Sequence, residues 1–144
     1  MIHLASPNDA AAIAILAQKL WNHHDVNELT AEFEVLLRKK DAALFLCTLD
    51  HQPIGFAQCQ LRYDYVEGTD TSPVGYLEGV FVEESYRHEG WGKALIAACQ
   101  IWAKEQGCSE FASDCELGNT ESLAFHLACG FQEVNRIICF TQKI

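Results

Sequence analysis

The sequence predicts a single α/β domain over residues 1–144, with a mixed central sheet and helices on both faces. The chain has 144 residues and 49% hydrophobic composition, enough for one sizeable core. Apolar runs of strand length are interleaved with segments of helical periodicity. The predicted order is a strand, two helices and three strands, followed by alternating helices and strands, which is typical of layered α/β domains.

The N-terminal half predicts two helices followed by a hairpin. A short strand at 2–5 precedes Ser6-Pro7-Asn8-Asp9, in which Ser6 is a helix N-cap, Pro7 the first helical residue and Asp9 the capping-box acid. This helix is expected to reach residue 20 or 21, and a second helix is expected over 28–40. Strands are expected at 42–49 and 54–62, joined by a turn at 50–53.

The C-terminal half predicts a buried strand at 76–82, after a loose polar segment at 64–74. A helix over 93–106 ends at Gly107, and a helix over 119–129 ends at Gly130, each with glycine in its usual C-terminal place. A strand at 109–114 lies between these helices. Two final strands are expected at 131–134 and 136–142.

Composition excludes several classes of protein. The net charge of −10 argues against a nucleic-acid partner; it fits a cationic substrate but is also common among acidic soluble proteins. No apolar stretch is long enough to span a membrane, and the N-terminus lacks a signal-peptide pattern. Seven cysteines without Cys-x-x-Cys spacing predict neither a disulfide framework nor a metal site. We therefore expect a reduced, cytoplasmic protein.

The most informative stretch is Arg87-His88-Glu89-Gly90-Trp91-Gly92, which joins a strand to a helix. The first turn of a helix has free N–H donors and the positive end of the helix dipole, and glycines let an anion approach the backbone. The first position is not glycine, and no Ser or Thr follows Lys93, so the loop is neither a dinucleotide fingerprint nor a P-loop. It predicts a pyrophosphate site.

A second motif, Asn119-x-x-Ser122-x-x-Phe125-His126-x-x-x-Gly130-Phe131, follows a strand and opens a helix. Together the two motifs resemble the acetyl-CoA-binding core of the GCN5-related N-acetyltransferase superfamily, over about residues 76–140. The resemblance implies acetyl-CoA as co-substrate and no metal. It places the cofactor contacts at Val80, Phe81, Val82, Arg87, His88, Glu89, Gly90, Trp91, Gly92, Lys93, Ala94, Asn119, Phe125 and His126.

His126 departs from the family pattern. Many members have a tyrosine at this position, where it protonates the departing thiolate. A histidine can donate a proton or stabilise the thiolate by hydrogen bonding, or it can be an ordinary residue of the helix surface. These alternatives stay open on sequence alone.

Outside the cofactor core, the chain resembles the aminoglycoside 6'-N-acetyltransferases, which confer antibiotic resistance by acetylating the 6'-amine of tobramycin- and kanamycin-type compounds. The similarity lies in Leu20-Trp21, in Tyr76 to Val82 and in Phe111-Ala112-Ser113-Asp114. It implies substrate contacts at Trp21, His24, Tyr65, Glu78, Asp114 and Asn135.

This set suits a polycationic sugar, which needs carboxylates for its ammonium groups and flat rings against its sugar faces. Glu78 lies within a buried strand, where a carboxylate is costly unless it meets a cation. Asp114 ends the neighbouring strand, at the edge where open sheets place ligands. Glu78 or Asp114 is the expected catalytic base, and the amine attacks the thioester directly. Structural alternatives are an ion pair of Glu78 with Arg62 and a core position for Trp21.

Two other functions remain open. The chain could acetylate another amine, such as a polyamine, a protein N-terminus or a lysine, or it could be a non-catalytic acyl-CoA sensor. The apolar terminal stretch Ile137–Thr141 further predicts a homodimer in which this strand pairs across a two-fold axis.

Overall fold

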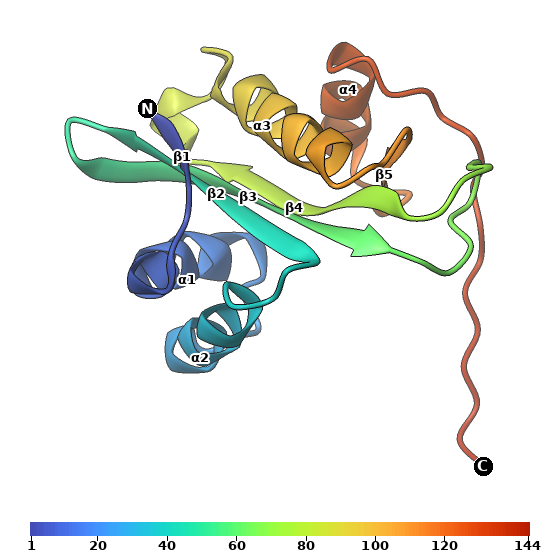
Figure 1. The fold of residues 1–144 in the computed structure, drawn as a ribbon, viewed down its shortest axis with the longest axis horizontal. Helices are drawn as coiled ribbons and strands as arrows, with labels where there is room; N and C mark the ends of the chain where they lie inside the picture. Colours follow the sequence, from blue (N-terminus) through green and yellow to red (C-terminus); the bar gives the residue numbers. More distant parts are fainter.

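A five-stranded sheet with the spatial order β1-β2-β3-β4-β5 forms the centre of the computed structural model, which describes residues 1–144 (Figure 1). Neighbouring strands are antiparallel, except for β4 and β5, which are parallel. The strands are β1 Ile2–Leu4, β2 Ala42–Leu49, β3 Gln52–Arg62, β4 Val74–Val82 and β5 Phe111–Ser113.

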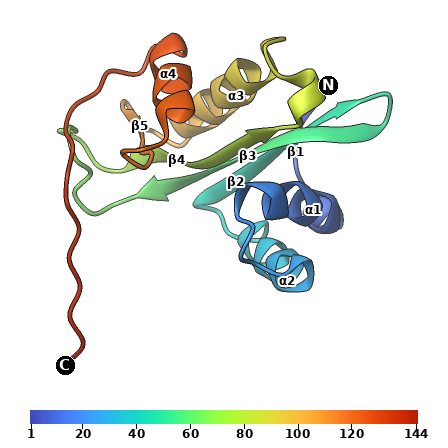
Figure 2. The same cartoon turned by 180° about the vertical axis from the view of Figure 1, so that it is seen from behind.

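Helices cover both faces of this sheet, which confirms the predicted fold class (Figures 1 and 2). On one face lie α1 and α2, and on the other lie α3 and α4. Their bounds are α1 Ala10–Leu20, α2 Val26–Leu36, α3 Trp91–Glu105 and α4 Thr120–Ala128, with short 3-10 turns at Pro7–Asp9 and Glu84–Tyr86. No helix is long and apolar enough to cross a membrane.

Each face of the sheet has its own hydrophobic core. Beneath α1 and α2, the fully buried Phe56 of β3 meets Phe33 of α2 and Trp21 edge-on, with ring centroids 6.4 and 6.0 Å apart. On the α3 side, Leu95, Ile96 and Cys99 are buried against β2, β3 and β4. All seven cysteines are free thiols.

Local capping explains where the first helices begin. The Ser6 backbone N–H donates to Asp9 Oδ2 at 2.8 Å, as the predicted capping box requires. The second helix begins earlier than predicted, because Asp25 Oδ2 accepts from the N–H groups of Asn27 and Glu28 at 3.0 and 3.3 Å. It also ends earlier, at Leu36.

The two predicted terminal strands are wrong for this structure. Residues 131–144 contain no strand, and the last part of the chain runs away from the body as an extended tail (Figures 1 and 2). A strand needs a partner for its backbone hydrogen bonds, and the tail has none. Its apolar side chains are therefore exposed, Ile138 by 81% and Phe140 by 90%.

Candidate active site

A wedge opens between β4 and β5, the last two strands at one edge of the sheet. Their pairing ends at Leu77 and Ser113, whereas β4 continues to Val82 without a partner on that edge. The Glu83 N–H donates to Ile54 O of β3 at 2.8 Å. In an antiparallel ladder the main-chain N–H and C=O groups of successive residues point to alternate sides, so those of Val80 and Val82 point away from β3 and into the wedge. The main-chain groups of Phe81 point toward β3, where Phe81 is opposite Phe56.

The loop after β4 forms a nest of free donors above this wedge. Positive φ angles at His88 (65°) and Gly90 (90°) curl the backbone into the start of α3. The first hydrogen bond of this helix runs from the Ala94 N–H to Gly90 O, at 3.0 Å. The backbone N–H groups of residues 88–93 donate to no protein acceptor. Such a run of free amides at a helix N-terminus is suited to a pyrophosphate.

Side chains fix this nest in place. Arg87 Nε donates to Val82 O at 2.8 Å, and Trp91 Nε1 donates to Glu89 Oε2 at 3.1 Å. Ala94, which the resemblance placed among the cofactor contacts, has its N–H committed to Gly90 within the helix.

α4 contributes the second wall of the wedge. Phe125 packs against the backbone of Gly92, where an added Cβ would lie 2.9 Å from Phe125 Cζ. Asn119 is the N-cap of α4, with Oδ1 accepting from the Ser122 N–H at 3.1 Å. His126 turns toward the sheet and lies 2.8 Å from the Ser113 hydroxyl, measured to Nε2. It is therefore not a simple surface histidine.

A β-bulge turns Glu78 onto the sheet face that carries α1 and α2. Gln58 is opposite Gly79 and Cys59 is opposite Leu77, so Glu78 is the extra residue. A bulge re-aims side chains, and it lets Glu78 and its neighbour Gly79 both face the α1 side.

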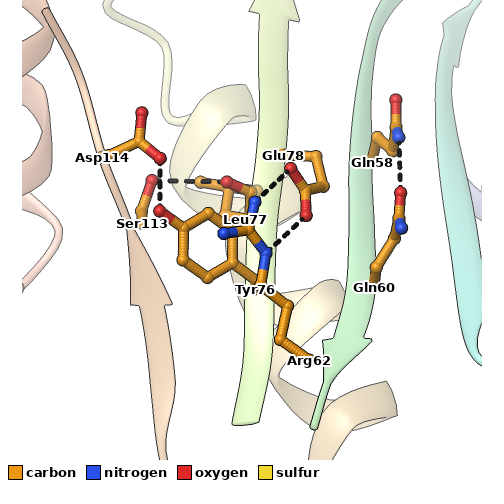
Figure 3. A network of polar contacts seen from close by, with 8 residues as sticks. All are labelled: Gln58, Gln60, Arg62, Tyr76, Leu77, Glu78, Ser113 and Asp114. Atoms are coloured by element: carbon orange, nitrogen blue, oxygen red, sulfur yellow. Dashed lines mark hydrogen bonds and ion pairs between the residues drawn. The ribbon is translucent and has the colours of Figure 1, made fainter. Parts of the chain in front are cut away.

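Glu78 and Asp114 belong to one polar network on that face (Figure 3). Arg62 donates to both carboxylate oxygens of Glu78, from Nε at 3.1 Å and from Nη2 at 2.9 Å. The ion pair of Glu78 with Arg62 that the sequence left open is therefore present. The Arg62 guanidinium also stacks 3.4 Å above the Tyr76 ring. The Tyr76 hydroxyl donates to Asp114 Oδ2. Thus one arginine and one tyrosine link the two predicted acids.

Burial first, and then the hydrogen bond to Asp114, raise the pKa of Tyr76 above its ordinary value of 10.0. A raised folded-state pKa stabilises the fold fully below pH 10, and this contribution is lost as pH rises toward the folded value. We expect the free energy of unfolding of wild type, relative to Tyr76→Phe, to fall above pH 10 by up to about 1.4 kcal/mol per pH unit. Urea unfolding from pH 8 to 11 measures this difference. The exposed Tyr63→Phe is the control, and an equal slope for Tyr63→Phe would contradict the assignment.

Trp21 and His24 line a hollow of about 320 Å³ beside this network. Gln58 forms part of the same lining, together with residues of α2. Trp21 crosses over Gly79, where an added Cβ would lie only 2.7 Å from Trp21 Cζ2. Trp21 is thus both a core neighbour of Phe56 and a wall of the hollow.

Tyr65 and Asn135 lie at the protein surface and do not belong to the polar network that links Glu78 to Asp114. Tyr65 is 77% exposed, and Asn135 Nδ2 donates to Glu67 Oε1 at 3.0 Å. Val134 packs so closely on Gly68 that an added Cβ there would approach within 2.6 Å. The start of the tail is therefore fastened to the loop before β4.

Two residues of the site were not predicted from the sequence. Tyr76 lies two positions before Glu78 on the same strand. Residues at this i, i+2 spacing face the same side of a sheet, which is the signal by which Tyr76 could have been identified. Ser113 lies within the Phe111-Ala112-Ser113-Asp114 motif, in which the sequence assigns a role to Asp114 alone. Its partner His126 is 13 residues away on another element, so no local pattern marks the pair.

No cluster of three or more His, Cys, Asp or Glu side chains is arranged to hold a metal ion.

Comparison with known proteins gives a consistent result. Residues 10–131 match the acetyltransferase (GNAT) family. An aminoglycoside N(6')-acetyltransferase type 1 of Stenotrophomonas maltophilia is 43% identical over 144 residues, which cover 99% of this chain and 93% of the relative. A protein of the same name from Acinetobacter haemolyticus is 42% identical, covering 90% of this chain and 88% of its own length.

Solved structures agree with the fold. AAC(6')-Iy in complex with the bisubstrate analog CoA-S-monomethyl-acetylneamine superposes with a TM-score of 0.95 at 38% identity, covering 100% of this chain and 98% of that one. Apo AAC(6')-IG from Acinetobacter haemolyticus gives a TM-score of 0.94 at 39% identity, with coverage of 100% and 99%.

Proposed function

Because the chain belongs to the acetyltransferase (GNAT) family, we propose that it transfers the acetyl group of acetyl-CoA to the 6'-amine of an aminoglycoside. One observation carries the proposal. The unpaired main-chain edge of β4 and the N–H nest that follows it lie on one side, and the carboxylates of Glu78 on β4 and Asp114 after β5 lie near an aromatic hollow on the other. The first arrangement suits a thioester with a pyrophosphate, and the second suits a compact polycation.

The unequal pairing of the two acids supports Asp114 as the base. Both oxygens of Glu78 are held by Arg62, whereas Asp114 accepts one side-chain hydrogen bond, from Tyr76 to Oδ2. Asp114 Oδ1 thus remains available to take a proton from the attacking ammonium group, directly or through water. With Asp114 as the base, the role of Glu78 is to bind an ammonium group of the substrate, in competition with Arg62.

The remaining groups complete a direct transfer. The deprotonated amine attacks the thioester carbonyl, and the Val80 or Val82 N–H stabilises the oxyanion that forms. The nest at residues 88–93 holds the pyrophosphate of the donor. Trp21 and His24 offer aromatic surface to a sugar ring, with Tyr65 and Asn135 at the rim.

The test of this function is acetyl-CoA turnover with tobramycin, spermidine and a basic peptide, followed through release of free thiol. We expect rapid release with tobramycin alone and a product carrying one acetyl group on the 6'-nitrogen. Turnover with spermidine or peptide only would indicate another amine substrate. Tight acetyl-CoA binding without turnover of any amine would indicate a sensor.

We also propose a cytoplasmic location and a role in antibiotic resistance. Acetyl-CoA is a cytoplasmic metabolite, and seven free thiols suit a reducing compartment. Expression of the chain in a susceptible bacterium is expected to raise the tobramycin concentration needed to stop growth.

A homodimer is the proposed assembly. The exposed tail of each chain, apolar at Ile137, Ile138, Phe140 and Ile144, would pair across a two-fold axis with the other copy. Exposed apolar side chains gathered on one segment often mark an interaction site. Burying them against a second copy favours association, because apolar atoms leave water.

Light scattering is expected to give a mass of about 32 kDa, twice the chain mass of 16.1 kDa. The double variant Ile138→Asp/Phe140→Asp should shift the mass to 16.1 kDa, because two charges cannot enter an apolar contact. Ile15→Asp, at an exposed site on α1, is the control and should remain dimeric. A wild-type mass of 16.1 kDa at working concentration would exclude the dimer.

A further inference from the structure

Ser113 and His126 form a hydrogen-bonded pair at the apex of the wedge. Ser113 is the last residue of β5, and its strand partner Leu77 is the last paired residue of β4 on this edge. The Ser113 hydroxyl lies 3.5 Å from Leu77 O (Figure 3) and 2.8 Å from His126 Nε2. Both side chains are only partly buried, so a molecule that enters the wedge can reach the serine.

The surroundings of His126 determine its tautomer. Nδ1 lies 2.7 Å from the Ser122 carbonyl oxygen, which can only accept, and 3.3 Å from the Ser122 hydroxyl, so the shorter contact favours a hydrogen on Nδ1. In the neutral ring, Nε2 is then the acceptor of the Ser113 O–H. The rings of Phe125 and Phe131 flank the imidazole, with centroids at 6.1 and 5.1 Å. Both ring nitrogens therefore have protein partners, and neither is left to face the wedge.

It follows that a proton leaving His126 for the wedge has to pass through Ser113. We propose that Ser113 is the group that protonates the departing thiolate, with His126 behind it as the proton source. This proposal rests on the acetyl transfer proposed above.

The proton transfer accompanies the loss of coenzyme A. When His126 is doubly protonated, Nε2–H donates to Ser113 Oγ, and the serine O–H is released from His126 to donate either to Leu77 O, 3.5 Å away, or to the sulfur in the wedge. As the tetrahedral intermediate collapses, the carbon–sulfur bond breaks and the sulfur takes the Ser113 proton. Ser113 takes the Nε2 proton in the same movement, and His126 is left neutral. The nitrogen of the new amide releases its extra proton to solvent, and solvent reprotonates His126 before the next turnover.

Steady-state kinetics test the relay. Ser113→Ala is expected to lower kcat about a hundredfold, the lower end of the range for general acid catalysis, with the KM values for acetyl-CoA and the amine unchanged. Ser113→Thr, which keeps the hydroxyl, should recover most of the rate. His126→Gln should cost about as much as Ser113→Ala, and the double variant no more than either, because the two residues act as one unit. Ser109→Ala, an exposed serine on the segment before β5, is the control.

A second measurement does not depend on turnover. In long-range ¹⁵N spectra of the six histidine rings, His126 is expected as the Nδ1–H tautomer, and its Nε2 resonance should move in Ser113→Ala but not in Ser109→Ala. A His126 ring with hydrogen on Nε2 alone would overturn the proposed order of proton transfer.

Three kinetic outcomes would also overturn it: full activity of Ser113→Ala, a Ser113→Thr variant as slow as Ser113→Ala, or strictly multiplicative losses in the double variant. An acetyl group found on Ser113 by mass spectrometry of quenched enzyme would replace the relay with a serine nucleophile. Failure of the proposed function is distinct, because wild type would then release no thiol with tobramycin. The same variants would then be measured with whichever amine wild type acetylates.

Discussion

Asp114→Asn is expected to lower kcat for tobramycin by about 10²- to 10⁴-fold, the usual range for loss of a general base. Asparagine has nearly the same shape as aspartate, and its Oδ1 can still accept the Tyr76 hydroxyl, so the network in Figure 3 should persist. It can neither take a proton nor balance the charge of an ammonium group. The change should therefore appear mainly in kcat, with the KM for acetyl-CoA unaltered.

Asp50→Asn provides a matched control. Asp50 lies in the turn between β2 and β3, at the opposite end of β3 from Arg62, and asparagine tolerates its positive φ of 49°. This variant should keep wild-type kinetics. If Asp114→Asn were also fully active while Glu78→Gln was not, the base would be Glu78 and the role of Arg62 would need to be reconsidered.

Alanine at Gly79 or Gly92 is expected to damage the two halves of the site separately. At Gly79 the new methyl would press on Trp21 at 2.7 Å and should raise the KM for tobramycin. At Gly92 it would press on Phe125 at 2.9 Å and should raise the KM for acetyl-CoA. We expect each KM to rise roughly tenfold, which corresponds to a loss of about 1.4 kcal/mol of binding free energy.

The measurement is a full two-substrate kinetic analysis of both variants. Gly118→Ala is the control, because no atom lies within 4 Å of the position its Cβ would take. Should Gly79→Ala raise the KM for acetyl-CoA as much as that for tobramycin, the two halves would not be separate, and Trp21 would not be a wall of the acceptor site alone.

The sequence was sufficient for features that depend on neighbours in the chain. The capping box at Ser6 and the N–H nest after β4 follow from residues within a few positions of one another, and the structure contains both. The apolar periodicity of the strands and helices likewise identified the layers.

Features that depend on register or on a distant partner were not predictable in this way. The bulge at Glu78 arises from how β3 and β4 align, and no local pattern marks it. The terminal segment has the composition of a strand, but a strand also needs an edge to pair with, which a pattern cannot supply. The Ser113–His126 pair joins two elements whose packing decides the contact.

The free amides of residues 88–93 have a consequence for how such an enzyme can evolve. Since the main chain supplies these donors, most side-chain substitutions in the loop leave its binding groups in place. Selection by a new antibiotic would therefore act on the side chains around the acceptor hollow, such as Trp21 and Gln58, with little effect on the binding of acetyl-CoA. The substrate range can drift under drug pressure while the machinery for acetyl-CoA is inherited unchanged.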